Sequence, residues 1–130
     1  MSGNRFLLDT NAVIFLLNGT SGLNRQLAEA EWIGISIITT LEFLCFDGLT
    51  ESDRECFLRF CERIEVVDLC YRDAPLASII VDLRQRYRLK IPDAIIAATA
   101  MMSGATLITA DAHFDRVSEL SKRSLPASSE

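Results

Sequence analysis

The sequence predicts an α/β domain: a three-layer α/β/α sandwich with a central parallel sheet of four to five strands. Short runs rich in apolar and β-branched residues alternate along the chain with longer stretches of helical periodicity. The predicted strands are joined through helices rather than tight turns, and this favours parallel pairing. The 130 residues suffice to bury the core of one such domain.

Short runs of apolar and β-branched residues predict strands over residues 6–9, 33–38, 64–69 and 105–109. Helical spacing predicts helices over residues 11–18, 23–32, from about 41, 50–64, 74–87, 93–102, and a short one from 111. Thr10 or Asn11 is expected to cap the first helix, and Thr39 or Thr40 the third. We expect the domain to span residues 1–120 and residues 121–130 to form a flexible tail.

Composition limits the possible function classes. The chain is 49% hydrophobic but has no apolar run long enough for a membrane span, so we expect a cytoplasmic protein without membrane contact. Its cysteines show no CxxC spacing, and His113 is the only histidine, which argues against structural zinc. We expect His113 to lie on the surface, outside the catalytic groups.

The net charge of the chain excludes a nucleic-acid binder only under one condition. The net charge of −5 argues against a nucleic-acid binder, because Lys and Arg make most phosphate contacts. The exclusion fails if several acids converge on divalent cations, because such a site attracts phosphate.

Four acids are expected at one edge of the sheet. Asp9 lies inside the apolar run FLLDTNAVIFLL, residues 6–17, where an unpaired carboxylate would cost several kcal/mol or more. Glu42 begins the helix after the second strand, Asp93 begins the helix before the fourth strand, and Asp111 follows that strand. The carboxyl ends of parallel strands share one edge, where ligands bind. We therefore expect the four carboxylates to lie close together.

Clustered carboxylates repel each other unless cations lie between them. Oxygen ligands select hard ions, which here means Mg²⁺ or Mn²⁺. Such ions can activate water and stabilise the leaving oxygen of a phosphodiester. For each acid taken alone, the alternative is a role at a helix N-terminus, which is a common use of Asp and Glu.

The stretches LLDTNAVI, TTLEFL, IPDAIIAATA and LITADAHF resemble, in order and spacing, the four motifs of PIN-domain ribonucleases, particularly VapC-type toxins of bacterial toxin-antitoxin pairs. The resemblance implies a metal-dependent endoribonuclease that cleaves RNA phosphodiesters with metal-activated water. It also implies that the catalytic residues and metal ligands are Asp9, Glu42, Asp93 and Asp111.

The resemblance further implies supporting roles for small polar residues. Thr10 or Asn11, together with Thr109, would orient acids or waters. The fourth acid is either Asp111 or Asp115, which lies one helical turn further on.

The densest basic run leads directly to Asp93 and supplies four candidate RNA-binding residues: Arg84, Arg86, Arg88 and Lys90. The alternative is a solvated helix face. A second candidate group comprises Arg116, Lys122 and Arg123. Arg88 departs from the family pattern, in which relatives often carry glycine.

The resemblance implies two protein partners, a second copy of the chain in a homodimer and a cognate VapB-type antitoxin. An antitoxin segment would lie in an apolar groove, for which the candidate side chains are Val13, Phe15, Leu16, Leu44 and Phe46. Core packing is the alternative for such residues.

Three other protein classes are alternatives to the nuclease interpretation. A haloacid-dehalogenase-like phosphatase needs a second Asp where this chain has Asn11. A phospho-accepting receiver domain, with Asp68 as the acceptor, needs a late lysine, and the only lysines are Lys90 and Lys122. A PIN-fold module that binds RNA or protein without cleaving it stays open.

Overall fold

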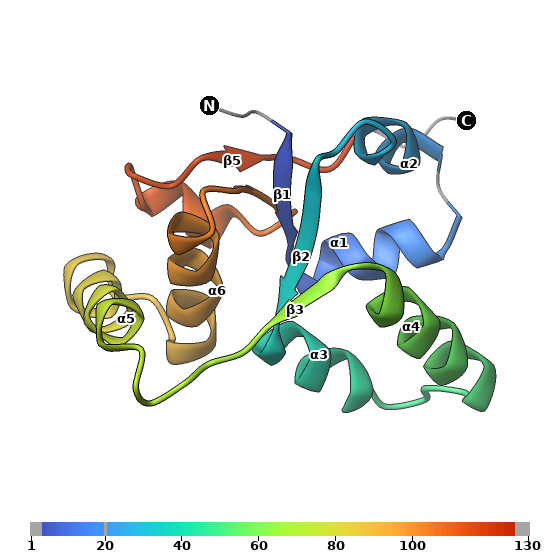
Figure 1. Cartoon of the computed structure of the whole chain (residues 1–130), viewed down its shortest axis with the longest axis horizontal. Coiled ribbons are helices and arrows are strands. Elements are labelled where there is room, and N and C mark those ends of the chain that lie inside the picture. The colour runs from blue at the N-terminus through green and yellow to red at the C-terminus, as the bar shows by residue number, and fades with distance from the viewer. Residues whose placement is uncertain (1–3, 20, 127–130) are drawn as a thin grey trace.

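The computed structural model describes residues 4–19 and 21–126, and its centre is a parallel sheet (Figure 1). The strands are β1 (Arg5–Leu8), β2 (Trp32–Ser36), β3 (Glu65–Val67), β4 (Thr106–Ile108) and β5 (Lys122–Arg123). Their order in the sheet is β3-β2-β1-β4-β5, and each neighbouring pair is parallel. All carboxyl ends therefore point to the same edge, as predicted.

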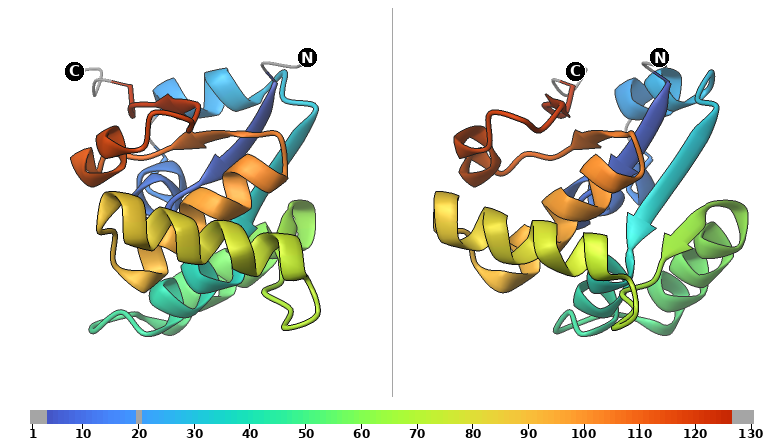
Figure 2. Two further views of the ribbon diagram at one scale, coloured as in Figure 1. Left: turned by 90° about the vertical axis from the view of Figure 1, so that its left-hand side faces the viewer. Right: turned by 60° about the vertical axis from the view of Figure 1, so that its left-hand side comes forward.

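The helices are α1 (Thr10–Leu17), α2 (Ser21–Leu27), α3 (Ile37–Leu44), α4 (Glu51–Arg63), α5 (Ala74–Tyr87), α6 (Ile91–Met102) and the 3₁₀ helix η1 (Ala112–Arg116). Helices α5 and α6 cover one face of the sheet, while α1 and α4 lie on the other (Figures 1 and 2). This confirms the three-layer prediction. Within the described ranges, no helix has the length and apolar character needed to cross a bilayer.

The alternation of side chains along β1 produces the two core layers. Leu7 faces the cluster that contains Ile96 of α6, while Phe6 and Leu8 face the cluster that contains Phe57 of α4. All five side chains are buried. Since β1 is the middle strand, the residue that follows it enters the site from the centre of the sheet.

Helix α3 begins earlier than predicted. Its N-cap is Ser36, whose hydroxyl accepts a hydrogen bond from the Ile38 amide at 3.0 Å, so the caps expected at the following threonines are wrong. The β-branched pair Ile37 and Ile38 favours a strand locally, but pairing of β2 with β3 ends at Ser36. Glu42 consequently lies in the second turn of α3, not the first.

The segment expected to be a flexible tail begins with a strand. The amide of Leu107 donates to the Ser121 carbonyl at 2.8 Å, and the amide of Thr109 donates to the Arg123 carbonyl at 3.2 Å. Residues 121–123 thus lie at the edge of the sheet, while residues 127–130 lie outside the described residues. A two-residue polar edge strand has no hydrophobic periodicity from which to predict it.

The turn from α5 to α6 has an unusual backbone. Arg88 closes α5 in the left-handed conformation, with φ 56° and ψ 37°, and its amide donates to the Arg84 carbonyl at 2.9 Å. Left-handed geometry costs an L-residue about 1–2 kcal/mol, and glycine is the usual residue there. The Arg84 guanidinium donates to the Leu89 carbonyl at 2.6 Å and braces the turn.

Candidate active site

Asp9 follows β1 and is only 6% exposed. Its side chain accepts hydrogen bonds from the Thr10 amide at 2.7 Å, the Thr109 hydroxyl at 2.7 Å and the Asn11 side-chain amide at 3.4 Å. Asp9 therefore caps α1 itself, in place of the predicted Thr10 or Asn11. Burial raises the pKa of Asp9, although the bonds from Thr109 and Thr10 oppose the shift.

Glu42 is joined to this first acid through Thr10. The Thr10 hydroxyl donates to Oε1 of Glu42 at 2.6 Å, which links the start of α1 to α3. The negative charge of Glu42 contributes to the raised pKa of Asp9. A hydrogen-bonded chain thus brings together two acids that are far apart in sequence.

The loop after β4 is fixed by two polar side chains. The Thr109 hydroxyl donates to Asp9 and also accepts a hydrogen bond from the Asp111 amide at 2.9 Å. The side-chain oxygen of Asn11 accepts from the Ala110 amide at 2.9 Å. Thr109 and Asn11 therefore connect the exits of β1 and β4 and set the position of Asp111.

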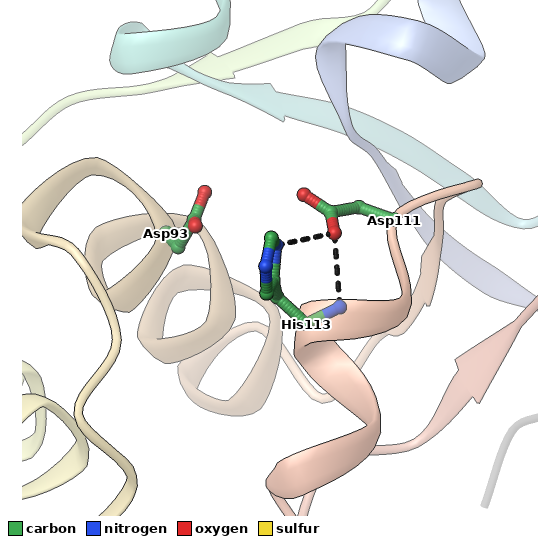
Figure 3. Close-up of side chains that lie close together, drawn as sticks. All are labelled: Asp93, Asp111 and His113. Carbon is green, nitrogen blue, oxygen red and sulfur yellow. Dashed lines mark hydrogen bonds and ion pairs between the residues drawn. The ribbon is translucent and has the colours of Figure 1, made fainter.

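Asp93 lies in the first turn of α6 and faces Asp111 across the site (Figure 3). Burial raises the pKa of Asp93, and the nearby charges of Asp111 and Glu42 raise it further. Coulombic effects also couple Asp93 to Asp9. The four predicted acids therefore share one electrostatic environment.

His113 lies beside these acids. One donor atom from each of Asp93, Asp111 and His113 falls within 4.8 Å of the others, and Nδ1 of His113 is 2.8 Å from Oδ1 of Asp111 (Figure 3). The imidazole is exposed, as predicted, and it lines the cavity beside the acids; that it takes no part in catalysis stays a prediction. Asp111 caps η1 by accepting from the His113 amide at 2.9 Å, so this cap holds the histidine next to the carboxylate.

A cavity of about 420 Å³ opens at this edge of the sheet. Its lining residues are Glu42, Arg88, Leu89, Lys90, Pro92, Asp93, Asp111, His113 and Arg116. Asp115 is not among them and instead forms an ion pair with Lys122. The geometry therefore favours Asp111 over Asp115 as the fourth acid.

Comparison with known protein families identifies a family for this chain. The family profile that describes the PIN domain matches residues 6–120. The chain belongs to the PIN-domain family. This membership removes the dehalogenase-like and receiver-domain alternatives.

Solved structures with the same fold come from toxin-antitoxin systems. A toxin-antitoxin complex from Klebsiella pneumoniae is 29% identical, covers 88% of this chain and 93% of its own, and has a TM-score of 0.72. VapBC2 from Rickettsia felis, bound to a DNA fragment from their promoter, is 22% identical, with coverages of 93% and 98% and a TM-score of 0.73. VapBC-1 from nontypeable Haemophilus influenzae is 19% identical, with coverages of 92% and 96% and a TM-score of 0.74. A search of curated proteins gave no match.

The donor set of this PIN domain fits a hard divalent cation. Its acids supply oxygen ligands. Burial, and after it repulsion from the neighbouring acids, raises the pKa values of Asp9 and Asp93, and a cation among the acids relieves that repulsion. Among the described residues, Asp9 has neutral hydrogen-bond donors and no ion pair with Lys or Arg. Among the described residues, no basic side chain therefore offsets the charge of the buried Asp9 carboxylate.

The predicted basic run divides into two groups. Arg84 is bound to the Leu89 carbonyl, and Arg86 forms ion pairs with Asp82 at 2.9 Å and Glu119 at 2.7 Å. Arg88 and Lys90 instead line the acidic cavity. The members of the second basic group also differ: Arg116 lines the cavity, Lys122 pairs with Asp115, and the Arg123 guanidinium lies 5.2 Å from the Phe6 ring centroid.

Apolar grooves lie beside α1. One, of about 500 Å³, is lined by Leu16 and by Phe60 of α4, and another, of about 200 Å³, is lined by Phe46 and Phe43. Leu16 and Phe46 thus occupy groove positions, as predicted. Val13 is fully buried in the core, which is the alternative given for these residues.

Proposed function

We propose that this PIN domain is a metal-dependent endoribonuclease and acts as the toxin of a toxin-antitoxin pair. The observation that carries the proposal is the convergence of Asp9, Glu42, Asp93 and Asp111 on one sheet edge of a PIN fold. The toxin role is supported by the likeness to the toxin-antitoxin complex from Klebsiella pneumoniae.

In this proposal Mg²⁺ or Mn²⁺ is held chiefly by Asp9 and Asp93, with Glu42 and Asp111 completing the ligand set. When bound, the cation supplies activation of water and neutralisation of charge on the phosphodiester. The protein contributes rigid placement. Thr109 fixes Asp9 and the Asp111 loop, while the Thr10 hydroxyl fixes Glu42.

We further propose that an antitoxin segment occupies the apolar grooves beside α1. Their apolar lining suits a helix or an extended peptide with hydrophobic anchors. Arg59 and Arg63 line the larger groove and would favour acidic residues on that segment. We also propose that the protein forms a homodimer and acts in the cytoplasm. Sedimentation velocity on the purified chain tests the dimer.

The deciding experiment is RNA cleavage by purified, antitoxin-free protein. Cleavage is measured with Mg²⁺, with Mn²⁺ and with excess EDTA, for the wild type and for Asp9→Asn. We expect cleavage that requires both the ion and Asp9. Asp47→Asn is the matched control because it removes an exposed carboxylate from the loop after α3, outside the cavity.

Binding of the ion is measured separately by isothermal titration calorimetry. Loss of metal binding in Asp9→Asn without any change in RNA cleavage would refute the catalytic role of the cluster. RNA binding by wild-type protein that has bound metal, with no cleavage of a total-RNA pool, would favour the non-cleaving binding module instead.

A further inference from the structure

Three basic side chains line the same cavity as the acids. Arg88 and Lys90 come from the turn between α5 and α6, and Arg116 comes from the end of η1. The opposing charges are those of Glu42, Asp93 and Asp111. The cavity therefore carries negative and positive charge side by side, in a protein whose net charge is −5.

These basic groups are available to a ligand. Among residues 4–19 and 21–126, the side chains of Arg88 and Lys90 make no hydrogen bond or ion pair, and the Arg116 guanidinium makes one long contact, 3.4 Å to the Tyr87 carbonyl. Arg84 and Arg86, on the preceding helix, already have protein partners. Arg84 and Arg86 thus differ from Arg88 in their contacts, although all three lie in the same basic run.

The backbone at Arg88 gives an independent observation. Its left-handed conformation, with φ 56°, would be relaxed by glycine. Because the Arg88 side chain makes no hydrogen bond or ion pair among the described residues, no such bond compensates for the backbone strain. Strain of this kind concentrates where a side chain serves a ligand.

We propose that Arg88, Lys90 and Arg116 form a phosphate-binding subsite that holds an RNA phosphate in the same cavity as the acids. The inference rests on the proposed nuclease function and adds the residues that hold the substrate. Guanidinium and ammonium groups supply the charge-assisted hydrogen bonds that phosphate oxygens accept.

The test is the substitution Arg88→Gly. It should relieve the backbone strain, which stabilises the fold, and at the same time weaken the binding of RNA. Affinity for a short fluorescein-labelled single-stranded RNA is measured by anisotropy in EDTA, where no metal-dependent cleavage occurs. We expect the melting temperature to rise and the affinity to fall by about 3- to 10-fold. The slope of log affinity against log salt should become shallower by about 0.7, the value for one lost phosphate contact to a single strand.

Three variants control this measurement. Arg88→Lys keeps the charge and should retain most of the affinity. Arg88→Asn tolerates the left-handed backbone without the charge and should bind as weakly as Arg88→Gly. Arg54→Gln removes one charge from α4, outside the cavity, and should leave the affinity unchanged.

Unchanged affinity and salt slope in Arg88→Gly would overturn the subsite, as would an equal loss in Arg54→Gln. Either result would leave metal-dependent cleavage by the wild type untouched. Conversely, a wild type that binds RNA through Arg88 but never cleaves it would refute the nuclease and retain the subsite. Failures of the two proposals are therefore distinguishable.

Discussion

The Thr109 hydroxyl links two acids of the site, Asp9 and Asp111, and its removal gives a quantitative test. Thr109→Val nearly preserves the shape of a residue that is only 2% exposed but removes its hydroxyl. The bond lost to the Asp9 carboxylate, at 2.7 Å, contributes about 1.5–3 kcal/mol, and the bond from the Asp111 amide, at 2.9 Å, about 0.5–1.5 kcal/mol. We expect the free energy of unfolding to fall by about 2–4 kcal/mol.

Urea unfolding at neutral pH in EDTA measures this change without a contribution from bound metal. Thr106→Val makes the same chemical change at the start of β4, where among the described residues the hydroxyl bonds only to Ser121 at the surface, and should cost about 0.5 kcal/mol or less. Thr109→Ser should recover most of the stability. A loss in Thr109→Val no larger than that in Thr106→Val would refute the proposed linking role of Thr109.

Two further predictions concern charge and helix capping. Asp93→Asn should stabilise the metal-free protein at neutral pH and remove the stabilisation by Mg²⁺. Because the folded pKa of Asp93 is raised above its ordinary 3.8, the charge penalty develops as pH rises from 3.8 through the folded pKa, so the advantage of Asp93→Asn should vanish below pH 3.8 in urea titrations. Thr50→Ala breaks the capping box with Asp53 and should cost about 1 kcal/mol of unfolding free energy in the same assay, with RNA cleavage unchanged.

The position of the acids could be predicted because it depends on topology. Asp9 and Asp111 follow strands that are parallel neighbours, so counting from each strand end brings them to one edge. Glu42 lies at that edge because α3 follows β2 at the same end of the sheet. This holds although the predicted start of the helix was wrong. Errors of a few residues at a helix start do not move an element to the other side of a sheet.

Side-chain partners could not be predicted in the same way. Arg86 and Arg88 look equivalent in a basic run, yet one is held by acids from α5 and from the loop after η1, and the other faces the cavity. His113 has no partner at obvious spacing, and only the cap formed by Asp111 directs it to the site. Such contacts depend on three-dimensional packing that a linear pattern does not contain.

The hydrogen bond between Thr109 and Asp9 spans 100 positions of the sequence. The first acid therefore leaves the ribosome long before the residue that fixes its carboxylate, and β4 must pair with the free edge of β1 to bring Asp111 into place. A partly synthesised chain lacks both Thr109 and Asp111, so it has no complete set of acids. A nuclease built in this order has no complete set of acids until residue 111 has been synthesised.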